Sequence, residues 1–410
     1  MAKGDAAGVP DFTDREAAEA WLRTQPRDVC VAIAARAALR MLPMLAMALE
    51  QNETKVSDAA LSSLRAVLVA WFAAGVRSQA GDAKVLGAST SASAAAASSR
   101  VARAATGAAS KSVSSCASAA AAVYASADIC TRAALISLGF NNYFHLFEIE
   151  VSFSAHTTAA AYEDAALILL HGAADPLANL PLWSKSDPEW ALYAWQALKT
   201  YLLAADEGWE VWTDWYEARL RGDPFDPDLE LARVLIDDAI WRQGPKAVNA
   251  EIAQLIAEHR AKAHNELMVR IADLEATIAA LKHEGSKRGP DVPPGLGHNN
   301  PPEAIDEVAE ELQHNLEVLK AQPPTPNDPA AAIAAVTGLK TTLSRLTSFT
   351  GEKLDLFITE ASKEGGRKFG AWAVRLAALG VGEWALDLSV KLAQALDAAI
   401  IWVRSLGVPI

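Results

Sequence analysis

The chain has 410 residues, a formal net charge of −13 and a hydrophobic fraction of 51%. This apolar fraction excludes a chain that is disordered throughout, and the acidic balance argues against nucleic-acid binding through phosphate contacts. The three cysteines, Cys30, Cys116 and Cys130, are too few and too irregularly spaced for a disulfide framework or a zinc site.

The first part of the chain carries repeated helix signals. Thr13 and Glu16 have the spacing of a capping box, which predicts a helix that begins there and ends at Pro26. Asp28 is a candidate cap for the next helix, in which Pro43 should cause a kink or an end. Residues 88–127 then form an Ala/Ser tract. We interpret it as a solvated segment, as a long helix in a hairpin, or as a weakly apolar membrane-inserting segment.

No uncharged run in the chain reaches the roughly 18 strongly apolar residues of a membrane-spanning helix. No apolar signal-peptide core follows the N-terminal residues. The sequence therefore predicts a cytoplasmic protein without a conventional transmembrane helix.

Proline and glycine divide the middle of the chain into helices. Asp187-Pro188 and Asp226-Pro227 each have the pattern of an N-cap followed by proline at the first helical position. Gly244-Pro245 ends one helix and begins the next. Neither residue type recurs before position 284, which predicts a helix of about 38 residues and about 57 Å.

Seven of the twelve tryptophans lie between positions 183 and 241. Several of these aromatic residues share one face of a predicted helix. We expect this stripe to be buried, because each buried Trp removes roughly 150–250 Å² from water. The alternative is a ligand or partner surface, for which the neighbouring acidic residues favour a cationic ligand. The candidate residues are Trp209, Trp212, Trp215, Tyr216 and Trp241.

The long predicted helix carries a heptad-like apolar pattern at Ile271, Leu274, Ile278 and Leu281. Such a helix must pack along its own domain or pair with another chain. The proline- and glycine-rich residues 284–302 that follow predict a flexible linker. We therefore expect an Ala-rich helical domain over residues 1–283 and a smaller helical module over residues 303–410.

The last segment, Phe369–Leu406, has a narrow polar stripe on an otherwise apolar helix. This pattern predicts the central helix of a small bundle, a helix that docks on a partner or a second copy, or a helix in a membrane interface. The acidic character of the stripe weakens the membrane alternative. The candidate association or membrane face comprises Trp372, Leu376, Trp384, Leu388 and Leu392.

Local signatures of catalysis are missing from the sequence. There is no nucleophile elbow, no phosphate-binding P-loop and no dinucleotide-binding fingerprint after a strand. His259 and His264 are five residues apart, which does not match the spacing of a zinc-protease helix. No catalytic, cofactor-binding or metal-ligating residue is therefore assigned, and a non-enzymatic role is favoured.

Two blocks of sequence carry a resemblance. The Trp-rich block Trp209–Gly222, followed by Gly244–Ile252, resembles a block that recurs in an uncharacterised alphaproteobacterial protein family. Asp14–Ala18 and Ala34–Pro43 are similar to the N-terminal part of the same group, and Gly297–Glu303 is similar to a linker in varied proteins of those bacteria. The resemblance implies a bacterial, helical, intracellular protein and implies no activity.

Together these features predict an all-α protein, with an Ala-rich multi-helix domain, a long closing helix and a smaller C-terminal helical module. The leading functional hypothesis is a non-enzymatic interaction or scaffold protein that forms homo-oligomers or binds a protein partner. A membrane-associated effector that uses the C-terminal helix is the first alternative. A small-ligand binder that uses the Trp-rich acidic helices is the second.

Overall fold

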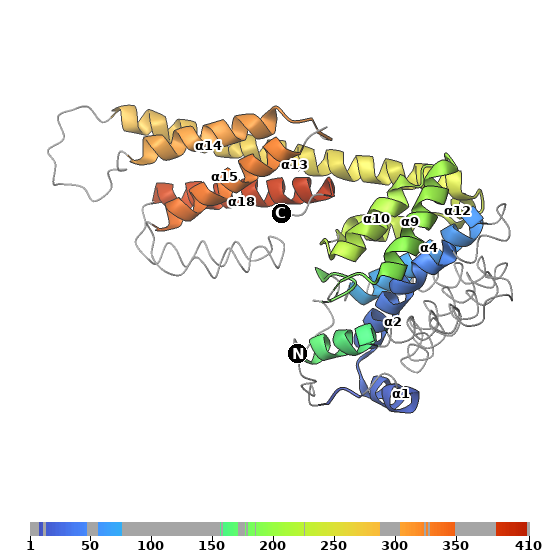
Figure 1. Cartoon of the computed structure of the whole chain (residues 1–410). Helices are drawn as coiled ribbons and strands as arrows, with labels where there is room; N and C mark the ends of the chain where they lie inside the picture. Colours follow the sequence, from blue (N-terminus) through green and yellow to red (C-terminus); the bar gives the residue numbers. More distant parts are fainter. Residues whose placement is uncertain are drawn as a thin grey trace. The chain divides into compact units, whose positions relative to one another are not determined.

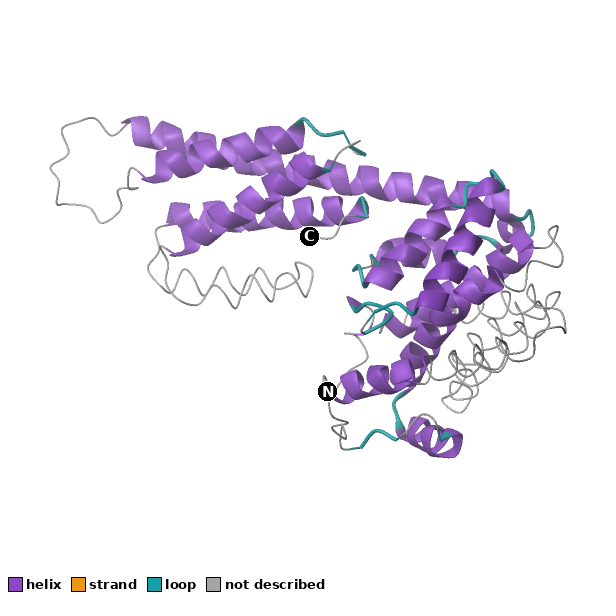
Figure 2. Ribbon diagram, in the orientation of Figure 1, coloured by secondary structure: helices purple, strands orange, loops and turns teal. Residues whose placement is uncertain are grey.

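The computed structural model describes residues 8–10, 14–46, 56–75, 159–170, 179–184, 186–224, 226–287, 304–323, 325–326, 329–348 and 383–407, together with residues 156 and 177. These residues form helices and no strands, which confirms the predicted all-α class (Figure 2). No helix among them is long and apolar enough to cross a membrane. The Ala/Ser tract 88–127 lies outside the described residues.

The contacts divide the chain into two compact units, residues 1–255 and 256–410. The division falls inside the long helix α13 (Pro245–Lys287), so the second part of this helix belongs to the second unit. Sequence analysis placed the boundary at residues 284–302. α13 includes the first four of those residues, and the remainder of the expected linker lies outside the described residues.

The first unit is a bundle of helices (Figure 1). α2 packs along α4, α11 also packs against α4, and α9 packs against the short 3-10 helix η1. A further helix spans residues 159–170. The elements are α1 (Arg15–Thr24), α2 (Arg27–Met41), η1 (Leu42–Met44), α4 (Val56–Gly75), α9 (Glu189–Ala204), α10 (Glu210–Arg221), α11 (Pro227–Val234) and α12 (Asp238–Trp241), followed by the start of α13.

Some helix starts in this unit follow the prediction, but the N-caps of α2 and α9 are Pro26 and Pro188 rather than the expected Asp28 and Asp187. Asp226 caps α11 through backbone N–H groups of the first turn, with Pro227 at the first position, as predicted. The N-cap of α1 is Asp14 rather than Thr13, because the Asp14 carboxylate accepts the N–H groups of Glu16 and Ala17 at 3.0 and 3.1 Å. α2 ends at Met41 and passes into η1, which contains Pro43, as expected from the missing N–H of proline.

The second unit has one apolar core formed by four helices, α13, α14 (Ala304–Lys320), α15 (Ala330–Ser348) and α18 (Glu383–Ser405) (Figure 1). The core includes Ile271, Leu274 and Ile278, so these three positions of the heptad-like face are buried within this chain, and the side chain of Leu281 lies outside the described residues. α14 and α15 approach closely at Gly338, where an added Cβ would lie 2.5 Å from the Asn315 side chain.

Candidate functional site

The Trp-rich stripe is buried inside the first unit. Trp209, Trp212, Trp215 and Tyr216 are each at most 4% exposed. α10 begins at Glu210, two residues after Gly208, whose φ of +76° allows a sharp turn that glycine adopts without strain. The indole rings of Trp212 and Trp215 then meet edge to face, with centroids 5.8 Å apart.

Each indole N–H of this stripe is hydrogen-bonded within the chain. Trp212 donates to Asn249 Oδ1 at 2.8 Å, and the Asn249 amide donates to the Glu207 carbonyl at 3.0 Å. Buried indole N–H groups need such partners, so these bonds fix the orientation of the rings. The complete set of acceptors is Glu207 for Trp209, Asn249 for Trp212, Glu230 for Trp215 and Ile236 for Trp241.

This arrangement matches the core interpretation of the stripe and leaves these rings no exposed face for a ligand. A small apolar cavity of about 10 Å³ lies beside it, between η1, α4, α9 and α10. That volume is about the size of a single water molecule, and its apolar lining offers a water no partner. The lining residues are Leu42, Leu45, Ala60, Leu64, Trp195, Leu198, Leu202 and Trp212.

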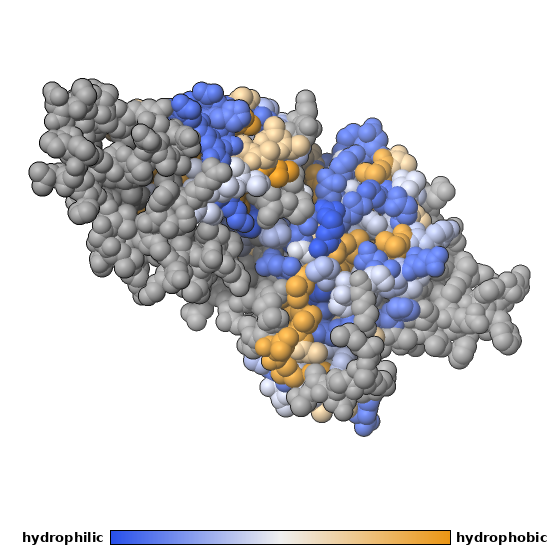
Figure 3. All heavy atoms as spheres, turned by 60° about the vertical axis from the view of Figure 1, so that its left-hand side comes forward, coloured by the Kyte–Doolittle hydropathy of each residue, from blue (hydrophilic) through white to orange (hydrophobic). Residues whose placement is uncertain are grey.

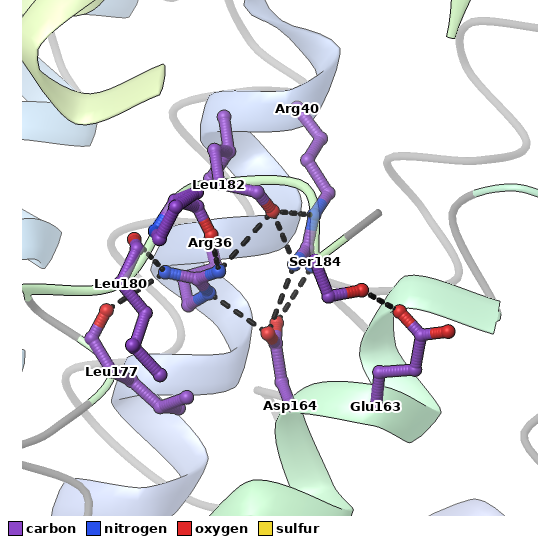
Figure 4. Close-up of polar contacts among 9 residues, drawn as sticks. Arg36, Arg40, Glu163, Asp164, Leu177, Leu180, Leu182 and Ser184 are labelled. Carbon is purple, nitrogen blue, oxygen red and sulfur yellow. Dashed lines mark hydrogen bonds and ion pairs between the residues drawn. The ribbon is translucent and has the colours of Figure 1, made fainter. Parts of the chain in front are cut away.

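A buried ionic cluster joins α2 to the helix of residues 159–170 (Figure 4). Arg36 and Arg40 are one helical turn apart on α2, and both donate to the Asp164 carboxylate, at distances of 2.7–3.0 Å. All three side chains are at most 2% exposed. One carboxylate thus faces two guanidinium groups in a site that excludes water.

Backbone carbonyls satisfy most of the remaining donors of this cluster (Figure 4). All five N–H groups of Arg36 have an acceptor: Nε donates to Asp164, and the two terminal nitrogens donate to four carbonyls. Arg40 adds two bonds to the Leu182 carbonyl. Burial, partly offset by Asp164, lowers the pKa of Arg36 to about 10, so the group remains charged at neutral pH. The four carbonyls belong to Leu177, Leu180, Pro181 and Leu182.

A second buried ion pair lies beneath the Trp-rich helix. Arg233 and Glu230 are 2.8 Å apart on α11, and Glu230 also accepts the indole N–H of Trp215. Both groups are less than 10% exposed. We assign this pair and the Arg36–Arg40–Asp164 cluster a structural role, because their carboxylates are occupied by donors of the chain itself.

The candidate association or membrane face of the C-terminal helix is only partly described. Leu388 and Leu392 are at most 2% exposed and belong to the core of the second unit. α18 is therefore one of the helices of a small bundle, in which α15 packs against both α14 and α18. These two side chains are therefore unavailable to a membrane or partner in this fold. Trp372 and Leu376 lie outside the described residues, as does the side chain of Trp384.

Sequence analysis missed an exposed face on α9. Eight of its side chains are exposed, and only one of them, Glu189 at its first position, carries a charge. On α14, by contrast, every exposed side chain among the described positions is ionisable: Glu310, His314, Glu317 and Lys320. Exposed apolar side chains of the described residues gather in patches between polar areas (Figure 3). We define the α9 face as Leu192, Tyr193, Gln196, Ala197, Thr200, Leu203 and Ala204.

Of the two charged residues of α9, Lys199 lies away from this face, whereas the exposed Glu189 lies one turn before Tyr193 on the same side. Lys199 pairs with Glu217 of α10 at 2.6 Å, and Trp195 donates its indole N–H to the same carboxylate. Burial alone would raise the pKa of Glu217, but the hydrogen bonds from Lys199 and Trp195 and the charges of Lys199 and Arg221 outweigh it. The pKa is therefore below its ordinary value of 4.5. These contacts hold α9 against α10 and keep its orientation fixed.

Glu217→Gln should consequently destabilise the first unit at neutral pH. A carboxylate whose pKa is lower in the folded state adds stability above its unfolded-state pKa and loses it as the pH falls through the folded-state value. The difference in free energy of unfolding between wild type and variant should therefore shrink as the pH falls below 4.5. Urea unfolding between pH 7 and pH 3 measures it. A difference in free energy of unfolding that is independent of pH would contradict the lowered pKa of Glu217.

No candidate metal site of three or more His, Cys, Asp or Glu side chains occurs in the described part of the chain. Comparison of the sequence with protein-family models and curated proteins, and of the fold with solved structures, finds no match.

Proposed function

We propose that this chain is a non-enzymatic helical scaffold protein that associates with a second copy through the α9 face. The observation that supports it is a largely apolar helix surface, on which Glu189 at the N-terminal end is the only exposed charged residue, in a chain of net charge −13. On this surface Leu192 is 48% exposed, Tyr193 79% and Leu203 36%. Contiguous exposed apolar surface of this kind marks interaction sites in soluble proteins.

Charge favours a contact made through this face. Two copies with net charge of the same sign repel each other in solution. A contact through side chains without charge adds no direct repulsion and no desolvation of ions, whereas the acidic faces would add both. Added salt screens the remaining repulsion and should strengthen the association.

Rigidity of the underlying helix also supports the proposal. The opposite side of α9 is anchored by Leu198 and Leu202, each 1% exposed, and by the Lys199–Glu217 pair. A surface held in this way loses little conformational entropy when it binds. Tyr193 would contribute most, since an aromatic side chain combines a large apolar area with few rotatable bonds.

Tyr193→Glu is expected to abolish the association, because it replaces the largest side chain of the apolar contact with a charged one. Light scattering should show wild-type protein above its chain mass of 43.5 kDa at high concentration, and the variant at that mass. Val269→Glu is the matched control, since Val269 is an exposed apolar residue (55%) on α13 of the other unit. It should associate like wild type.

Two results would overturn the proposal. Wild-type protein that stays at 43.5 kDa at every concentration would show that the chain is monomeric. Association that survives Tyr193→Glu would show that another surface carries it. Far-UV circular dichroism of each variant establishes that its helices are intact.

A further inference from the structure

We draw no further inference here: the strongest candidate, the buried cluster of Arg219, Arg233 and Glu230 between α10 and α11, carries none, because it belongs to the structural ion pair already described and nothing in the described part of the chain shows room for a ligand beside it.

Discussion

Asp164→Asn is expected to lower the free energy of unfolding of the first unit by about 3–5 kcal/mol, the cost of removing one partner from a buried ion pair. The substitution preserves the shape of the side chain but removes the only carboxylate that Arg36 and Arg40 contact within the buried cluster. Two guanidinium groups would then remain charged in a site that excludes water. The four carbonyls around Arg36 supply only partial charge in compensation.

Glu163→Gln is the matched control for this prediction. Glu163 precedes Asp164 on the same helix, but its side chain bonds to Ser184 at the surface (Figure 4). Surface substitutions of this type usually change stability by less than about 0.5 kcal/mol. Urea unfolding followed by tryptophan fluorescence measures both variants. If Asp164→Asn lowers the free energy of unfolding by less than about 1 kcal/mol, the cluster contributes little to stability.

Gly222→Ala should also lower the free energy of unfolding of the first unit strongly, by about 2–5 kcal/mol, because it combines backbone strain with a steric clash. Gly222 ends α10 with a φ of +75°, a left-handed conformation that costs alanine about 1–2 kcal/mol. A Cβ at this position would also lie 2.3 Å from the backbone nitrogen of Pro181. Backbone atoms cannot move aside as the end of a flexible side chain can, so the whole segment would shift.

Gly244→Ala separates the two contributions. Gly244 also has a positive φ, of +92°, but its added Cβ would meet no atom of the described residues within 4 Å. The Gly244→Ala variant should lose only the stability that backbone strain costs, about 1–2 kcal/mol. Thermal unfolding of the two variants side by side measures the difference. If Gly222→Ala and Gly244→Ala lose the same amount of stability, the clash with Pro181 is relieved without a cost in free energy.

Local signals in the sequence predicted some helix starts correctly and placed others one or two residues away from the true cap. Asp226-Pro227 and Gly244-Pro245 mark the starts of α11 and α13 because capping and the missing proline N–H act within a few residues. The error at Thr13 has the same origin. Thr13 and Asp14 are neighbouring candidates, and only the geometry of the first turn decides which oxygen accepts the N–H of Glu16.

Periodicity showed that certain faces are apolar but not what covers them. Ile278 and Leu388 lie on apolar stripes, and the structure places both in one core within the chain. α9 shows the opposite case. It is apolar on nearly all sides, so the pattern could not show that Leu198 faces inward and Tyr193 outward. The packing of α9 against η1 decides this, and it is not encoded locally.

The ionic cluster could not be predicted because its members are far apart in sequence. Arg36 and Asp164 are 128 positions apart, and no local motif joins them. Two arginines four residues apart in an apolar run were the available signal, since buried arginines require partners. The sequence could not indicate which of the chain's acids would supply that partner.

This separation has a consequence for the order of events during synthesis. Arg40 of α2 bonds to the carbonyl of Leu182, which lies 142 positions later in the chain. At about 5–20 residues per second, a ribosome needs roughly 7–30 s to extend the chain from one residue to the other. During that interval α2 carries two arginines whose final partners do not yet exist, so the first unit cannot close its core until the later segment has left the ribosome.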